Sequence, residues 1–194
     1  MSARNQLRII GGRWRSRRLS FPPIAGLRPT ADAVRETVFN WLQGHLQGAR
    51  CVDLFAGSGA LGLEAVSRGA HQAVLVERSQ IAIASLRENV ARLGAGEAVQ
   101  VIRADAERFL AGKAEPFDLV FLDPPFQSAL LERVCRQLDS GGWLAAGALI
   151  YLETDRHRTL GDLPGSWRVL RADGAGTVSY RLLRREAATL IGDG

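Results

Sequence analysis

From residue 51 onward, short apolar segments alternate with segments whose apolar residues recur at helical spacing. The apolar segments, which suit buried strands, cover residues 51–55, 73–77, 98–104, 117–123 and 143–153. The helical patterns between them cover residues 61–68, 80–93, 106–111 and 129–138. Strands and helices in regular alternation are typical of a parallel sheet with helices on both faces, so the sequence predicts an α/β fold.

Further elements flank this repeat on both sides. Residues 167–172 and 176–183 predict two strands, with Asp173-Gly174-Ala175 as the turn of an antiparallel hairpin. Near the start, residues 7–19 predict a small hairpin with its turn at Gly11-Gly12. The expected architecture is therefore a mainly parallel seven-stranded sheet that ends in an antiparallel hairpin and carries an N-terminal extension.

A linker and a helix are expected between the N-terminal hairpin and the first sheet strand. Residues 21–26 contain two prolines and predict the linker, and residues 28–42 predict the helix, with Thr30 as its N-cap. Val34, Val38, Trp41 and Leu42 form the apolar face of this helix. We divide the chain into an N-terminal extension (1–27), a main α/β domain (28–185) and a tail (186–194).

Charge is distributed unevenly along the 194 residues, whose net charge is +5. The chain contains no acidic residue before Asp32, but it has seven arginines there. A basic arm on a mildly acidic body favours a polyanionic partner such as a nucleic acid over an ordinary solvated tail. The arginines expected to contact that partner are Arg13, Arg15, Arg17, Arg18 and Arg28.

Several classes of protein are disfavoured by composition. No window approaches the roughly 20 apolar residues of a membrane span, and the first residues lack the apolar core of a signal peptide. The two cysteines, Cys51 and Cys135, fall in a predicted strand and a predicted helix, where they suit a reduced core better than a disulfide or a metal site. We expect a cytoplasmic monomer without a metal.

The segment VDLFAGSGALGLEA places Gly57 and Gly59 where the first sheet strand gives way to a helix. Glycines at this point usually let a ligand approach the backbone, and ligands in such sheets bind beyond the carboxyl ends of the strands. Acidic residues fall at or near four of those ends: Asp53, Glu77, Asp105 and Asp123. The sequence therefore predicts a polar pocket along this edge of the sheet.

Two ligands compete for that pocket. Gly57, Gly59 and Gly62, with Glu77 twenty residues after Gly57, fit a dinucleotide fingerprint and would suit NAD. However, a pyrophosphate disfavours a carboxylate as near as Asp53, which suits the amino group of a methionine. Glu77 would accept from ribose hydroxyls and Asp105 from an adenine amine, so the set fits S-adenosylmethionine better.

The fourth sheet strand ends in Asp123-Pro124-Pro125-Phe126. The prolines fix the backbone, so that a carboxylate, a bare carbonyl and an aromatic ring face one small space. Two acceptors can hold the hydrogens of a conjugated amine and turn its lone pair toward a sulfonium methyl group, while Phe126 stacks on the base. The motif thus favours methylation of an exocyclic amine on an unpaired or flipped base.

The segments VDLFAGSG and DPPF resemble those of class I S-adenosylmethionine-dependent amino-methyltransferases. Two N-terminal segments, RIIGGRWRSRRL and RPTADAVRETVFNWL, are more particular and resemble the RsmD family, which methylates N2 of a guanine in small-subunit ribosomal RNA. The resemblance covers about residues 7–183. In the second segment the family pattern has an arginine where this chain has Ala33, which weakens an RNA-contact role at that position.

The resemblance implies a role for each matching residue. Asp53, Phe55, Gly57 and Gly59 line the methionine end of the cofactor; Glu77 holds the ribose; Asp105 and Ala106 hold the adenine; Asp123, Pro124, Pro125 and Phe126 form the catalytic turn. It also implies an assembled or nearly assembled 30S subunit as the partner. The alternatives are an N6-adenine or glutamine amino-methyltransferase, a non-catalytic RNA-binding module and an NAD oxidoreductase.

Overall fold

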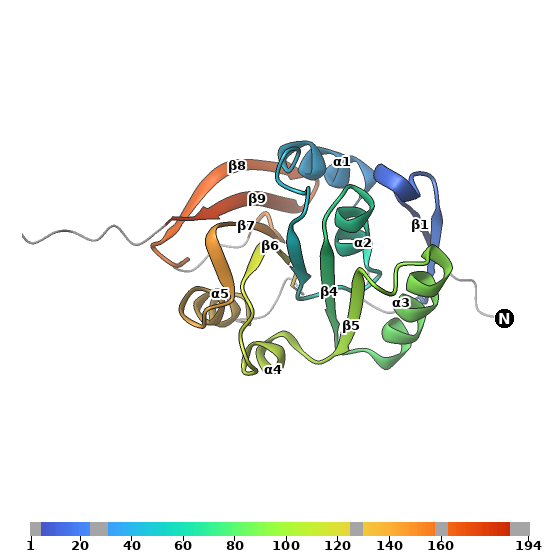
Figure 1. The fold of residues 1–194 in the computed structure, drawn as a ribbon. Coiled ribbons are helices and arrows are strands. Elements are labelled where there is room, and N and C mark those ends of the chain that lie inside the picture. The colour runs from blue at the N-terminus through green and yellow to red at the C-terminus, as the bar shows by residue number, and fades with distance from the viewer. Residues whose placement is uncertain (1–4, 24–30, 125–129, 158–162, 187–194) are drawn as a thin grey trace, which may run out of the picture.

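The structure is a computed structural model that describes residues 5–23, 31–124, 130–157 and 163–186. Its large sheet has the strand order β5-β4-β3-β6-β7-β9-β8 (Figure 1). The strands are β3 (Arg50–Asp53), β4 (Gln72–Glu77), β5 (Val99–Arg103), β6 (Phe117–Leu122), β7 (Leu144–Asp155), β8 (Trp167–Ala175) and β9 (Val178–Arg185). Strands β3 to β7 are parallel to one another, whereas β9 is antiparallel to β7 and to β8. The expected seven-stranded α/β fold is confirmed.

Helices cover both faces of this sheet (Figure 1). The helices are α1 (Asp32–Trp41), α2 (Ala60–Ser67), α3 (Gln80–Leu93), α4 (Ala106–Leu110) and α5 (Leu130–Ser140). Helices α1, α2 and α3 share one hydrophobic cluster, and α4 and α5 share a second cluster on the opposite face. Alternate residues of each central strand point to the two clusters, as the pleat requires: Phe121 and Tyr151 to the first, Leu122 and Leu152 to the second.

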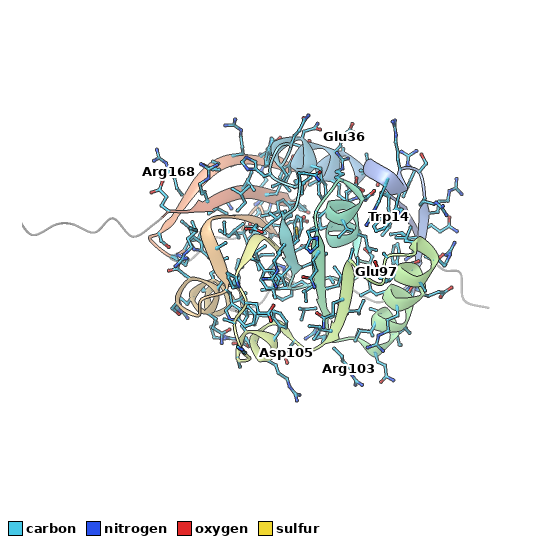
Figure 2. All side chains as sticks on the ribbon, viewed as in Figure 1. Trp14, Glu36, Glu97, Arg103, Asp105 and Arg168 are labelled. Atoms are coloured by element: carbon cyan, nitrogen blue, oxygen red, sulfur yellow. The ribbon has the colours of Figure 1, made fainter. Side chains whose placement is uncertain are left out.

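The parallel strands place their carboxyl ends along one edge of the sheet, which we call the carboxyl edge. It is formed by Asp53, Glu77, Arg103, Leu122 and Asp155, the last residues of β3 to β7. Figure 2 marks its position by Arg103 and Asp105. All the acidic residues that the sequence assigned to a pocket lie at or next to this edge.

The N-terminal hairpin pairs β1 (Asn5–Arg8) with β2 (Arg18–Phe21) and contains the short 3-10 helix η1 (Gly12–Trp14) in its connection. Leu7, Ile9, Trp14, Leu19 and Phe21 all belong to the hydrophobic cluster of α1–α3. The hairpin is therefore packed onto the main sheet domain and continues its core. The proposed domain boundaries at residues 27 and 185 stay predictions.

Three local expectations are wrong. Gly11-Gly12 is not a two-residue turn, because the hairpin ladder ends at the pair Arg8↔Arg18 and a longer connection follows. The C-terminal turn does not lie at Asp173–Ala175, which pair with β9; the strands reverse after Ala175 instead, where Gly176 has φ +59°. Helix α1 begins at Asp32 with Ala31 as its N-cap, which provides no capping side chain, so Thr30 does not have that position.

Candidate active site at the carboxyl edge

The loop after β3 is held by backbone contacts and by Glu77. Gly57 and Gly59 both have positive φ, +51° and +80°. Gly59 is the N-cap of α2, and a Cβ atom there would lie 2.6 Å from Cδ2 of Leu86. The need for glycine at this position is therefore explained by backbone conformation and packing. Close approach of a ligand, the usual reason for glycines in such a loop, is not required to explain Gly59.

Glu77 connects this loop to the start of α3. Its Oε2 accepts a hydrogen bond from the Gly57 amide at 2.9 Å, and its Oε1 accepts one from the Ser79 amide at 2.7 Å. A carboxylate has about four lone-pair sites, so both oxygens can still accept from the two hydroxyls of a ribose. The contacts orient Glu77 for that role without exhausting it.

Asp53 lies buried at the end of β3, where its Oδ1 accepts from the Phe55 amide at 3.3 Å. Burial raises the pKa of Asp53 to about 7; hydrogen bonds from the amides of Phe55 and Gly62 oppose this shift and the charge of Glu77 adds to it. A buried carboxylate of this kind is stabilised in its ionised form by a cation. The position therefore suits the ammonium group of an amino acid.

Asp105 and Ala106 begin α4 at the same edge. Asp105 is the N-cap, and its Oδ1 accepts from the Arg108 amide at 2.8 Å. Asp105 is exposed and Ala106 is buried. The carboxylate thus has a structural role as a cap and keeps acceptor capacity on its solvent-facing side.

Asp123 directly follows β6 and is partly buried, whereas Pro124 is buried. Burial raises the pKa of Asp123 well above its usual range, and the charges of Glu153 and Asp53 raise it further. Among the described residues, no hydrogen bond to Asp123 is found. Pro125 and Phe126, which were predicted to complete the turn, lie outside the described residues.

Sequence reasoning missed Glu153, a buried acidic residue near the end of β7. Its Oε2 accepts a hydrogen bond from the hydroxyl of Tyr151 at 2.8 Å. A signal was present, because the fifth apolar segment ends in an acid, as do the segments 73–77 and 117–123. Among the described residues, no group of three or more His, Cys, Asp or Glu side chains is arranged to hold a metal ion.

The predicted RNA-contacting arginines lie elsewhere. Arg13, Arg15, Arg17 and Arg18 are exposed, and Arg28 lies outside the described residues. No ion pair is formed by the four exposed arginines within the described part of the chain. Trp14, which lies at the tip of this hairpin, is well away from Arg103 and Asp105 at the carboxyl edge (Figure 2).

The hairpin tip docks on the C-terminal end of α2, which points away from the carboxyl edge. The hydroxyl of Ser67 donates to the Gly11 carbonyl at 2.6 Å and accepts from the Trp14 amide at 3.0 Å. A Cβ atom on Gly12 would lie 1.8 Å from the Ser67 carbonyl oxygen, so the close contact requires glycine there. The two glycines thus serve docking rather than a tight turn.

A second residue that sequence reasoning missed, Glu64 of α2, holds the same hairpin. Its carboxylate is fully buried and accepts from the amides of Ile10 (2.8 Å) and Gly11 (2.7 Å). Arg68 Nε donates to it at 2.7 Å and Arg35 Nη1 at 3.5 Å. The signal in the sequence was α2 itself, which is apolar on all sides apart from Glu64 and Ser67 and so had to be covered.

The chain resembles known proteins over most of its length. Residues 7–184 match the family described as "Conserved hypothetical protein 95". The chain is 50% identical over 186 residues to ribosomal RNA small subunit methyltransferase D of Escherichia coli (strain K12), covering 96% of this chain and 93% of that protein. It is 41% identical over 184 residues to the protein of the same name from Haemophilus influenzae, covering 93% and 95%.

Solved structures show the same relationship. The protein yhhF from Escherichia coli has a TM-score of 0.88 at 47% identity and covers 94% of this chain and 99% of its own. An RNA methyltransferase from Salinibacter ruber, in complex with S-adenosyl-L-homocysteine, has a TM-score of 0.62 at 16% identity, covering 82% and 94%. The second likeness shows the fold alone.

Proposed function

Because the chain belongs to the family of ribosomal RNA small subunit methyltransferase D, we propose that it transfers a methyl group from S-adenosylmethionine to N2 of a guanine in small-subunit ribosomal RNA. The observation that carries this proposal is the match to these relatives across nearly the whole chain. The carboxylates at the carboxyl edge support it, because they suit the cofactor and an amine substrate together.

The cofactor would lie along the carboxyl edge. Asp53 would pair with the methionine ammonium group, Phe55, Gly57 and Gly59 would line that end, Glu77 would accept from the ribose, and Asp105 with Ala106 would hold the adenine. When bound, S-adenosylmethionine supplies an electrophilic methyl group on a sulfonium. The fit rests on charge: a buried carboxylate with a raised pKa gains stability beside the ammonium cation, whereas the pyrophosphate of NAD would be repelled.

The amine would be held at Asp123 and Pro124. The exocyclic nitrogen of guanine is a poor nucleophile because its lone pair is delocalised into the ring. Acceptors on both of its hydrogens turn the lone pair out of conjugation, and the remaining acceleration comes from proximity and orientation. Phe126, with Pro125 shaping the turn, would stack on the base, a contact worth about 1–3 kcal/mol.

The positions of the arginines support a large, folded substrate. Helix α2 has 8 residues and hence a length of about 12 Å, and it separates the hairpin tip from the glycine loop. An RNA that reaches both Arg13 and Asp123 must follow the side of the protein over more than that length. We therefore favour an assembled or nearly assembled 30S subunit as substrate, bound by a monomeric, cytoplasmic enzyme.

No helix in the described residues combines the length and hydrophobicity needed to span a membrane.

An N6-adenine or glutamine amino-methyltransferase remains the alternative activity, because an Asp-Pro-Pro-Phe turn accepts any such amine. The resemblance of the N-terminal segments favours the guanine.

The proposal is tested by incubating the protein with S-adenosylmethionine labelled in the methyl group and with three substrates: unmethylated 30S subunits, naked 16S RNA and duplex DNA. Mass spectrometry of the digested nucleosides should identify N2-methylguanosine, with more product from subunits than from naked RNA. Label in N6-methyladenine, or in protein, would instead establish the alternative. No transfer to any substrate by a protein that binds the cofactor would contradict the proposal.

A further inference from the structure

A hollow lies at the tip of the N-terminal hairpin, on the side of the molecule that Trp14 marks in Figure 2. Its volume is about 450 Å³, which is within the range of about 300–1,000 Å³ that is usual for pockets that take one small ligand. Its lining includes Gly12 and Arg13 of the hairpin, Gln47 of the loop between α1 and β3, and Ser67, Arg68 and Gly69 at the end of α2. The hollow is thus separate from the site at the carboxyl edge.

The walls of the hollow are held by close contacts of the backbone. Gly12 has φ +74°, and a Cβ atom on it would lie 1.8 Å from the Ser67 carbonyl oxygen. Gly69 has φ +114°, and a Cβ atom there would lie 2.6 Å from Oε1 of Gln47. The amide of Gly48 also donates to the Gly69 carbonyl at 3.0 Å. Three segments that are far apart in the sequence therefore meet here with a defined geometry.

The hollow carries one positive charge that no acidic residue balances. No acidic residue is found among the described residues that line it. The charge of Arg68 is neutralised, because its Nε donates to the buried carboxylate of Glu64 at 2.7 Å. The guanidinium of Arg13 lies 4.3 Å from the centroid of the Trp14 ring and forms no ion pair within the described part of the chain. Arg13 is exposed, so its charge is available to an anion from solution.

The part of the hollow beside α2 provides hydrogen-bond acceptors instead. Helix α2 ends at Ser67, and the last carbonyls of a helix carry a partial negative charge that is directed beyond its C-terminus. The side-chain oxygen of Gln47 lies at the same turn, against Gly69. A phosphate is disfavoured beside such acceptors, whereas the amine of a base or a ribose hydroxyl can donate to them. The charges of the hollow therefore suit the two parts of a nucleotide.

We propose that this hollow binds one unpaired nucleotide of the substrate RNA, other than the guanine that is methylated. This inference rests on the proposed function and adds a second point of recognition to it. Arg13 contacts the phosphate, and Gln47 with the end of α2 accepts from a base amine or from the 2′-hydroxyl. The nucleotide is unpaired, because a base in a duplex cannot leave the stack to enter a closed-sided hollow without losing its pairing and stacking.

The hollow is too far from the carboxyl edge to receive the target guanine. Helix α2 has 8 residues and a length of about 12 Å, and it separates the hollow from the glycine loop at its other end. A folded RNA presents two nucleotides at such a spacing in a fixed geometry, whereas a flexible strand must lose conformational freedom to do so. The second point of recognition therefore favours a folded substrate over naked RNA.

The first test compares Gln47→Glu with Gln43→Glu, which adds the same charge at another exposed position of the same loop. A carboxylate in the hollow repels the phosphate, so Gln47→Glu should weaken binding of 30S subunits by about tenfold or more. Gln43→Glu should change it by about twofold or less. Calorimetry with S-adenosylmethionine should give the wild-type affinity for both variants, which shows that they are folded. Equal binding of subunits by the two variants would overturn the proposal.

A double-mutant cycle tests whether Arg13 and Gln47 contact the same nucleotide. If they do, Arg13→Gln combined with Gln47→Ala should weaken binding by about threefold less than the product of the two single effects. Arg17→Gln serves as the matched control, because Arg17 is an exposed arginine of the same hairpin. Its effect should multiply with that of Gln47→Ala. Multiplication in both pairs would contradict a shared nucleotide.

A second measurement identifies what occupies the hollow. Gln47→Cys provides a single reactive thiol, because Cys51 and Cys135 are completely buried and burial raises the pKa of each to about 12. A photo-crosslinker on this thiol should react in complexes with 30S subunits at one unpaired nucleotide, which reverse transcription maps away from the methylated guanine. Crosslinks to paired nucleotides or to ribosomal protein, or a yield no higher than that from Gln43→Cys, would overturn the proposal. Failure of the proposed function is distinguishable, because the wild type would then form no N2-methylguanosine in any substrate.

Discussion

Two acidic residues of this protein, Glu64 and Asp123, differ in the charges that surround them. Glu64 accepts hydrogen bonds from two backbone amides and two arginines, all provided by the hairpin, α1 and α2 itself. Burial and the negative charges of Glu153 and Asp53 instead raise the pKa of Asp123. A buried charge that is surrounded by opposite charges stabilises one arrangement of the chain. A carboxylate among like charges is instead stabilised when a cation or an amine hydrogen binds to it. The comparison distinguishes a carboxylate that builds the fold from one that awaits a ligand.

The largest effect is expected from removing Asp123, the acid that faces the substrate. Asp123→Ala should lower the single-turnover rate of methyl transfer by about 100-fold or more, because the amine loses its orientation. Binding of 30S subunits should change much less, and Asn should retain part of the rate because its amide oxygen still accepts. The measurement is rapid-quench methyl transfer beside equilibrium binding. Transfer by Asp123→Ala at nearly the wild-type rate would mean that the amine is held elsewhere.

Removing the fold-building acid should have the opposite signature. Glu64→Gln leaves Arg68 without its buried countercharge and leaves Arg35 paired with the exposed Asp32, and it should cost about 3–5 kcal/mol in the free energy of unfolding. The exposed Glu97→Gln is the matched control and should change stability by about 0.5 kcal/mol or less. Urea unfolding measures both. If Glu64→Gln costs under about 1 kcal/mol, the hairpin is held by its apolar contacts instead.

The sequence predicts the sheet better than it predicts the surroundings of Glu64 and Asp123. Each apolar run from residue 51 onward is a local signal, and α3 begins and ends at the predicted residues, Gln80 and Leu93. Five of the predicted strands became parallel neighbours because short strands joined by helices admit few other arrangements. The carboxyl edge followed directly, and with it the positions of Asp53, Glu77, Asp105 and Asp123.

The surroundings of Glu64 and Asp123 depend instead on contacts between residues that are far apart in the sequence. Glu64 contacts Ile10 and Gly11 across more than fifty positions, and Arg35 of α1 is completely buried. Glu153 is placed beside Asp123 by the register between β6 and β7, which includes an irregularity between Phe117 and Leu119. Such irregularities shift which residues face one another, and no local pattern announces them.

A further prediction concerns Asp53 at the carboxyl edge and the dependence of cofactor affinity on pH. The folded pKa of Asp53 is about 7, far above its unfolded value of 3.8, so Asp53 holds a proton in the free protein below pH 7. A cationic ligand binds the ionised form, so affinity for S-adenosylmethionine should rise with pH up to about 7 and level off above it. Below that point the loss should approach tenfold per pH unit. Calorimetry at pH 6 and pH 8 measures this, and Asp53→Asn should bind weakly with little pH dependence. An affinity independent of pH in the wild type would place the ammonium group away from Asp53.

The smallest effect is expected at the hairpin, where the docking provided by Glu64 holds arginines in place for RNA. Arg13, Arg15 and Arg17 are exposed, so replacing all three by Gln should leave the fold and cofactor affinity intact. For each phosphate that the variant no longer binds, the slope of log affinity against log salt concentration should become shallower by about 0.7–0.9. Fluorescence titration of 30S subunits at several salt concentrations gives this slope. Arg136→Gln, an exposed position on α5 across the sheet, serves as the control and should leave it unchanged. An equal slope in the triple variant and the wild type would show that the hairpin arginines are solvated charges, and that Glu64 serves stability alone.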